Sequence, residues 1–184
     1  FIMIRVIFSR MRGGDICPPR VPISKVAWSW LGAFLSMYFV AILSSLTEVD
    51  VLKSMFLVGS FGASAVLIYG APQADFSQPR NLIGGHIISA FIGVTLQKYL
   101  TLDIALLGAL AVSISIVAMH FTRTLHPPGG ATALIAVIGS TELHNSGYYF
   151  VVTPVAIGTL ILLVIALVIN NLSKSPPING PNFL

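Results

Sequence analysis

Long apolar runs are the feature that most constrains what this chain folds into. They follow one another between residues 26 and 172, with only short polar segments between them. A helix that crosses a bilayer needs about 20 consecutive apolar residues. Charged residues make up 9% of the chain, whereas soluble domains carry about 25%. The sequence therefore excludes an ordinary soluble domain and predicts an all-α membrane protein.

The runs predict about six transmembrane helices, although one of them is only about half a bilayer long. Residues 1–25 mix apolar and basic side chains, which predicts a cytoplasmic segment at the membrane surface. Residues 173–184 are rich in Pro and Asn, which predicts a flexible C-terminal tail after a transmembrane domain over residues 26–172. The expected spans are Val26–Leu46, Ser54–Tyr69, Leu82–Leu100, Ile104–Phe121, Ala131–Ser140 and Phe150–Leu172.

The basic residues predict how the domain is oriented. With six crossings, eight Lys and Arg residues fall on one side of the membrane and two on the other. We therefore expect both termini in the cytoplasm of a bacterium, across its inner membrane, or on the equivalent side of a chloroplast envelope. Most of the net charge of +4 follows from this topology, so it is no argument for nucleic acid. The eight residues are Arg5, Arg10, Arg12, Arg20, Lys25, Arg80, Arg123 and Lys174, and the two are Lys53 and Lys98.

An internal echo divides the domain into two halves. Gly62–Ile68 resembles Gly130–Ala136 at an offset of 68 residues. Each half holds three expected crossings, so the second half enters the membrane in the opposite direction, as in inverted-repeat transporters. The echo predicts a 3+3 inverted repeat. The alternative is a chance recurrence of small residues in an apolar chain.

Both echoing segments contain residues that break helices. Gly59, Ser60 and Gly62 are expected to interrupt the second span. In the second half, Pro127 and Pro128 remove two N–H donors and push the residue before each toward extended geometry. Such backbone at membrane depth persists only where it is buried in protein or lines a cavity. We therefore expect two broken helices that meet near the midplane.

The helix restart after the prolines predicts an anion site. Its first-turn N–H groups lack partners, and the partial positive charge there favours an anion. The alternative is that Gly-Ala-Ser runs only let helices pack closely, which is the expectation for Gly85, Ser89 and Gly93. The predicted substrate-binding residues, in which Ser64 and Thr132 supply hydroxyls, are Gly62, Ala63, Ser64, His126, Gly129, Gly130, Ala131 and Thr132.

Four ionisable residues lie at or within the expected spans, and such residues are functional hypotheses by default. His126 is expected to reach the same cavity and to carry a coupled proton, with His86 as a second candidate. Arg80 and Arg123 are candidates for the cytoplasmic approach, where cations draw anions. The alternatives are structural: the histidines bond loose carbonyls, and the arginines anchor the helices at the membrane surface.

Other chemistry is not expected. The acidic residues fall in expected loops, histidines are the only metal-capable residues in the spans, and no Ser-His-Asp spacing occurs there. The sequence thus predicts a protein that is not an enzyme, with no catalytic residues, no bound metal and no cofactor.

The string LHPPGGATAL, Leu125–Leu134, resembles the signature of the HPP family of small integral membrane proteins. Phe61–Ala65, Gly70–Pro72 and the residues from Gln78 to His86 resemble the first-half pattern of that family. Members in cyanobacteria and plant chloroplasts are regarded as nitrite transporters, and many bacterial members have no assigned substrate. The resemblance therefore implies a helical membrane protein and, for part of the family, nitrite as the substrate.

These observations lead to one function hypothesis and one alternative. The hypothesis is transport of a small monovalent anion, nitrite first and nitrate second, through a midplane site formed by half-helix N-termini. The alternative is a non-transporting membrane sensor or assembly subunit, which would have a packed interior at the two breaks. The expected partners are the anion, the lipid bilayer and further copies of the chain in a homo-oligomer, with no nucleic acid.

Overall fold

The computed structural model describes residues 6, 8, 20–46 and 51–173, with residues 43–46 and 51–58 described by their backbone alone. Every regular element within these ranges is a helix. In chain order the α-helices are α2 (Ile23–Leu46), α3 (Val51–Gly70), α4 (Pro79–Tyr99), α5 (Ile104–Thr122), α6 (Pro127–Ile138), α7 (Thr141–Ser146) and α8 (Ile157–Leu172), with a 3-10 turn η1 (Asp75–Ser77) and a π-turn η2 (Val151–Ala156).

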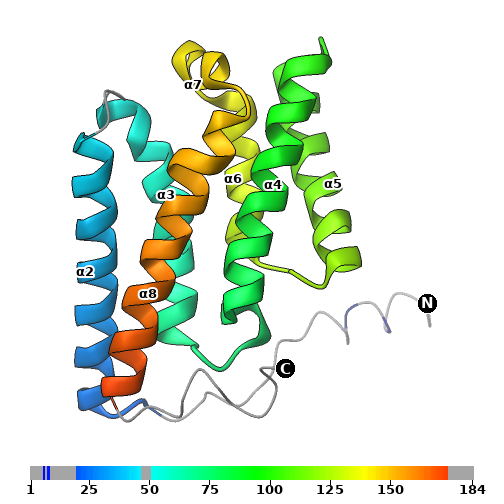
Figure 1. Ribbon diagram of the computed structural model, residues 1–184. Helices are drawn as coiled ribbons and strands as arrows, with labels where there is room; N and C mark the ends of the chain where they lie inside the picture. The colour runs from blue at the N-terminus through cyan, green and yellow to red at the C-terminus, as the bar shows by residue number, and fades with distance from the viewer. Residues whose placement is uncertain (1–5, 7, 9–19, 47–50, 174–184) are drawn as a thin grey trace.

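The long helices run up and down alternately in one bundle (Figure 1). Helices α2, α3 and α8 form one side, α5 forms the other, and α6 lies within the bundle against α3, α4 and α5. The most extensive contact joins α4 and α6. The start of α2 and the end of α8 lie at the same end of the bundle, as an even number of crossings requires.

Within the residues that the structure describes, three segments are long and apolar enough to cross a membrane: Ile23–Ile42, Ile104–Thr122 and Val151–Leu172. The segment Gly59–Gly70 of α3 and the whole of α6 are apolar but shorter. Large apolar side chains also face outward, and lipid is the solvent that suits such a surface. The prediction of an all-helical membrane protein is confirmed, whereas six spans in an inverted repeat stay a prediction.

The predicted break in the second span does not occur. Helix α3 runs without interruption through Gly59, Ser60 and Gly62. A glycine inside a helix costs only about 1 kcal/mol relative to alanine, which helix packing outweighs. The fold therefore has no helix start near Gly62, and the first half contributes no half-helix N-terminus.

The predicted break in the second half is present. The helix after it restarts at Pro127, two residues before Gly129, the first residue after the two prolines. Helix α5 ends at Thr122, and Arg123 then adopts left-handed geometry at φ 55° and ψ 38°. His126 is extended at φ −140°, and α6 begins at Pro127. The expectation that both prolines lie outside the helix is wrong, because they occupy its first two positions, where an N–H would have no partner inside the helix.

The last predicted span is not a uniform helix. It begins as the π-turn η2, in which Thr153 is extended at φ −126° and ψ 118°, and Thr153–Pro154 is a cis peptide bond. The regular helix α8 starts only at Ile157. The expected surface segment and flexible tail fall mostly outside the described residues.

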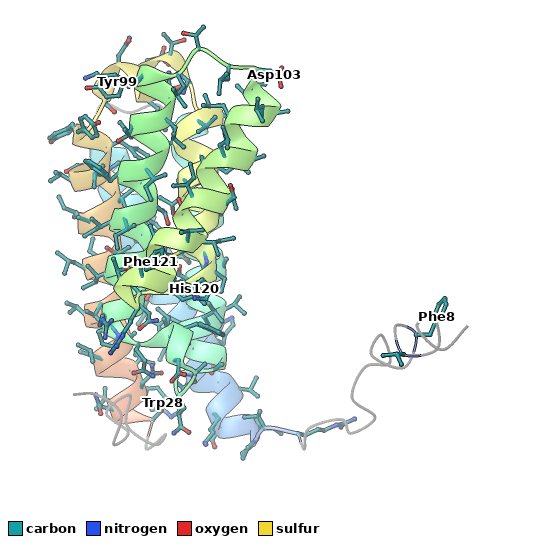
Figure 2. All side chains as sticks on the ribbon, turned by 90° about the vertical axis from the view of Figure 1, so that its right-hand side faces the viewer. Phe8, Trp28, Tyr99, Asp103, His120 and Phe121 are labelled. Atoms are coloured by element: carbon teal, nitrogen blue, oxygen red, sulfur yellow. The ribbon has the colours of Figure 1, made fainter. Side chains whose placement is uncertain are left out.

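The turn between α5 and α6 is recessed into the bundle. In Figure 2, His120 and Phe121 from the last turn of α5 lie well inside the level of Trp28, which belongs to α2. Figure 1 shows the same turn short of the ends of α2 and α8. Residues 123–126 therefore sit within the depth of the long helices.

Candidate functional site

Small residues bring α4 and α6 into close contact. A Cβ added to Gly93 of α4 would lie 2.5 Å from the carbonyl oxygen of Ala133. A Cβ added to Gly129 of α6 would lie 2.7 Å from the carbonyl oxygen of Gly85 and 2.9 Å from Oγ of Ser89. The expected packing role of Gly85, Ser89 and Gly93 is confirmed. These residues pack α4 against α6 within the same bundle.

This close approach gathers four polar side chains in the bundle interior, called here the buried cluster. Ser64 comes from α3, His86 from α4, His126 from the residue before α6, and Thr132 from the second turn of α6. Each of the four has 0% of its surface exposed. Ser64 and Thr132, the first and the last of these predicted residues in the sequence, are 68 positions apart. All four side chains nevertheless lie in contact through one series of hydrogen bonds.

The atoms of the buried cluster form one continuous chain. Oγ of Ser64 lies 2.7 Å from Nε2 of His86 and 2.8 Å from Nε2 of His126. Nδ1 of His86 lies 2.7 Å from Oγ1 of Thr132. Nδ1 of His126 lies 2.7 Å from the backbone carbonyl oxygen of Phe76 in η1. The chain therefore runs from Thr132 in α6 to the turn that joins α3 and α4.

The positions of the protons follow from the carbonyl at one end. A carbonyl oxygen only accepts, so Nδ1 of His126 donates to Phe76. In a neutral ring Nε2 of His126 then accepts, and Ser64 donates to it. Ser64 has a single proton, so Nε2 of His86 donates to Ser64 and Nδ1 of His86 accepts from Thr132. With both rings neutral, this is the arrangement that satisfies all four contacts.

The two hydroxyls occupy matching positions in the echo. Ser64 and Thr132 are 68 residues apart, and they contact the two ring nitrogens of the same residue, His86. Each hydroxyl also lies near the carbonyl oxygen four residues earlier in its own helix, at 3.1 Å for Ser60 and 3.4 Å for Pro128. Each hydroxyl oxygen therefore has a second acceptor toward which its proton can turn.

Comparison with known proteins gives the family. Residues 18–178 match the family described as HPP, transmembrane region. The chain belongs to the HPP family. Two transmembrane proteins of Dictyostelium discoideum are similar to it: one is 44% identical over 170 residues, or 91% of this chain and 54% of the relative, and the other is 42% identical over 165 residues, or 88% and 57%. The chain spans about half the length of these curated relatives. No solved structure matches it significantly.

The turn that carries the HPP motif is held by the first turns of α4. Nη2 of Arg80 donates to the carbonyl oxygen of Thr122 at 2.7 Å, and Nδ2 of Asn81 donates to that of Leu125 at 2.8 Å. Gly84 leaves room for the side chain of Thr124, which an added Cβ would meet at 2.6 Å. The family pattern from Gln78 to His86 thus supports the HPP turn as well as supplying one ring of the buried cluster.

Two contributors to the site were not among the predicted site residues. Asn81 lay within the family pattern, but a half-buried amide at a helix start carries no distinct signal in a single sequence. Phe76 acts through its backbone carbonyl, which no residue type reveals. Both were outside the reach of motif reasoning because they depend on how η1 and α4 fold against α6.

The remaining predicted residues lie outside the buried cluster. Ala63 and Ala131 are exposed on the outer faces of their helices, and Gly62 is half-buried, with no atom within 4 Å of an added Cβ. Arg123, directly after α5, and Arg80, in the first turn of α4 beside the end of α5, are both exposed. Side chains that share a motif point in different directions around a helix, so only every third or fourth one reaches a common site.

The start of α6 does not present the predicted cradle of free N–H groups. Its first two residues, Pro127 and Pro128, have no N–H, and the N–H of Gly129 donates to the carbonyl oxygen of His126 at 2.8 Å. Gly129 and Gly130 are buried against neighbouring helices. The hydrogen-bond donors that the site offers are therefore side chains. No group of three metal-ligating side chains occurs among the residues that the structure describes.

Proposed function

We propose that this HPP domain carries a small monovalent anion across its membrane, with nitrite as the first substrate and nitrate as the second. The observation that carries the proposal is the buried cluster, in which two imidazoles and two hydroxyls lie fully buried among apolar helices. Polar and ionisable residues at such depth are costly and mark ion pathways in membrane proteins. An added proton on either ring makes the cluster a cation with several donors, which suits an anion.

The surroundings of the cluster support an anionic substrate. Arg80 and Arg123 are exposed beside the recessed turn that leads to His126. Fixed cations at the mouth of a site raise the local concentration of anions. The family resemblance supports the same substrate class, because some HPP proteins are regarded as nitrite transporters.

Transport requires the cluster to open. Its four side chains bond one another in this structure, so an anion must replace at least one of these bonds. The ring N–H groups and the two hydroxyls are the donors that the anion takes over. A carrier that alternates between a closed cluster and an open one fits this arrangement better than a permanently open pore.

The proposal places both ends of the described bundle in the cytoplasm or its equivalent. Lys25, Arg80 and Arg123 lie at helix ends on the side where α2 starts and α8 ends, and Lys98 lies at the opposite end of α4. This distribution follows the positive-inside rule. A bacterial inner membrane, with a chloroplast envelope as the alternative, and a homo-oligomer remain predictions. Lipid is the partner of the outward apolar side chains.

One observation favours a second function. In the described structure every member of the buried cluster has its hydrogen bonds satisfied by another protein group. A non-transporting sensor or assembly subunit requires such a packed interior and no substrate. The two functions differ in whether purified protein moves an anion.

Nitrite uptake into proteoliposomes tests the proposal, with nitrate, chloride and formate as competitors and protein-free vesicles as the blank. We expect saturable uptake that Thr132→Val and His126→Gln each reduce by about tenfold, the effect of losing roughly 1.4 kcal/mol. The matched control is His120→Gln, because His120 is exposed on α5 outside the cluster. No uptake of any of these anions by folded protein contradicts the proposal and favours the subunit.

A further inference from the structure

The buried cluster is also arranged to move a proton. We infer that Ser64 passes one proton between the rings of His86 and His126, and that the transported anion moves together with that proton. The coupling to the anion rests on the proposed function. The proton chain itself stands on the positions of four side chains and three backbone carbonyls.

The cluster accommodates an extra proton on His86 without breaking a contact. The proton binds Nδ1, which then donates to Oγ1 of Thr132 at 2.7 Å. The hydroxyl proton of Thr132 turns away to the carbonyl oxygen of Pro128 at 3.4 Å. The bond from Nε2 of His86 to Ser64, and the bond from Ser64 to His126, are unchanged. All groups remain satisfied after one O–H rotation.

The proton then passes from His86 to His126 through Ser64. The Nε2–H bond of His86 breaks as that proton binds Oγ of Ser64, over a separation of 2.7 Å. The original O–H bond of Ser64 breaks as its proton binds Nε2 of His126, over 2.8 Å. Ser64 stays neutral, His86 returns to neutrality and the positive charge now lies on His126.

The loaded state on His126 is satisfied as well. Both ring nitrogens of His126 donate, one to Ser64 and the other to the carbonyl oxygen of Phe76. The hydroxyl of Ser64 donates back to His86, or to the carbonyl oxygen of Ser60 once Nε2 of His86 carries a proton again. Phe76 belongs to η1, where its side chain is 40% exposed. The chain therefore leads from the interior toward the end of the bundle at η1.

Each ring is the titratable group that faces the other. The ring centroids of His86 and His126 are 5.0 Å apart, and the ring of Phe61 lies edge-on to His86 at 5.3 Å. Two charges on these neighbouring rings repel, so the cluster holds one extra proton at a time. The other titratable or charged side chains described on α3, η1, α4 and α5 are Tyr69, which bonds Ser36 of α2, and the exposed Asp75, Arg80, Lys98, Tyr99, Asp103, His120 and Arg123. On the segment that packs against the far ends of α4 and α6, the corresponding groups include Glu142, His144, which contacts the carbonyl oxygen of Val137, and Tyr148, which contacts Thr95.

The link between proton and anion is electrostatic. A lone cation in an apolar interior is expensive, and so is a lone anion. The two together form a pair of zero net charge, in which each offsets the desolvation cost of the other. An anion in the buried cluster therefore favours the protonated ring, and the protonated ring favours the anion. This reciprocity is the physical basis of cotransport.

The proton chain is tested without transport by nitrogen-15 NMR of histidine-labelled protein in lipid bilayers. At alkaline pH we expect the proton of His126 on Nδ1 and that of His86 on Nε2, which are opposite tautomers. Ser64→Ala removes the partner of Nε2 on both rings. His126 should keep its proton on Nδ1, because the carbonyl of Phe76 only accepts. His86 should instead lose its fixed tautomer, because Thr132 can either donate or accept. Ser113→Ala should change neither ring, because Ser113 is exposed and bonds Leu110 of its own helix. The same tautomer on both rings in the unaltered protein overturns the proton chain.

The coupling is tested with nitrate in vesicles that contain a pH-sensitive dye. Nitrate is preferred here because nitrous acid crosses bilayers unaided and would acidify vesicles without the protein. We expect one proton to enter with each nitrate, and Ser64→Ala to lower proton and nitrate entry together. Nitrate uptake with no proton overturns the coupling and leaves the proposed function standing. No uptake of any anion overturns the proposed function and the coupling, while the opposite tautomers would still support the proton chain.

Discussion

Two segments of this protein have similar sequences and different helical settings. Gly59–Gly70 lies inside the continuous helix α3, whereas Pro127–Ile138 is the whole of the short helix α6. Both nevertheless place a fully buried hydroxyl, Ser64 or Thr132, against His86. The comparison teaches that the two segments of the echo are alike in one buried hydroxyl on the inner face of each helix, and that a helix start is not needed to place this hydroxyl against His86.

The difference between the segments lies in what surrounds their backbones. Gly129 of α6 is pressed against the carbonyl oxygen of Gly85, while the matching position in α3 is Phe61, a large buried ring. Helix α6 therefore approaches α4 through its backbone, and α3 approaches through side chains. Four experiments break or sharpen this contrast.

The largest effect is expected from Gly129→Ala. The new Cβ would lie 2.7 Å from the carbonyl oxygen of Gly85, and a backbone atom cannot rotate away. We expect the free energy of unfolding in detergent to fall by about 2–3 kcal/mol, the upper part of the range of about 1–3 kcal/mol for overpacked cores. Gly70→Ala is the control, since nothing lies within 4 Å of its added Cβ. Equal stability of the two variants would show that α6 does not pack tightly on α4.

The next effect separates the two hydroxyls. Ser64→Ala leaves two ring nitrogens without their partner, whereas Thr132→Val leaves only one. We expect losses of about 2 and about 1 kcal/mol in unfolding free energy, because a buried group without a partner is costly. Denaturant titration in detergent measures both. A greater loss for Thr132→Val would contradict the central position given to Ser64.

A smaller effect is expected from Asn81→Ala. This substitution tests what holds the turn that allows a new helix, α6, to begin in the second segment. The amide of Asn81 holds the carbonyl oxygen of Leu125 in the turn before α6. We expect a loss of about 1 kcal/mol, typical of one hydrogen bond, and faster amide hydrogen exchange in residues 123–126. Gln97→Ala on the same helix is the control. Unchanged exchange in the turn would mean that the prolines alone hold it.

The smallest effect is expected at the matching glycines. An added Cβ meets nothing within 4 Å at Gly62 and only Val112 at 3.6 Å at Gly130. Because alanine is favoured over glycine inside helices, we expect Gly62→Ala and Gly130→Ala each to change stability by no more than about 1 kcal/mol, with a gain rather than a loss. Thermal unfolding of the pair measures this. A large loss at either position would reveal a close contact that this structure lacks.

The sequence predicted the helical bundle well because apolar length and composition are local properties. The expected spans 104–121 and 82–100 correspond to α5 and α4 within a few residues, since Asp103 caps α5 and Pro79 opens α4. The sequence failed at Gly59–Gly62, where small residues signal a break and the helix continues. It also failed to foresee the extended Thr153 that delays α8 to Ile157. In both places packing against neighbouring helices determines whether the backbone is helical.

Residue types alone determined that this is a helical membrane protein and that His126, His86, Ser64 and Thr132 are worth attention. Imidazoles are rare enough in apolar runs to stand out without a structure, and the two hydroxyls stand out because they occupy matching positions in the echo. Only the tertiary structure decided that the four meet, that His86 lies between the two hydroxyls, and that Ala63 and Ala131 face outward. The physical reason is that hydrogen bonds between helices depend on the rotation and depth of each helix, which the close α4–α6 contact fixes and no single segment encodes.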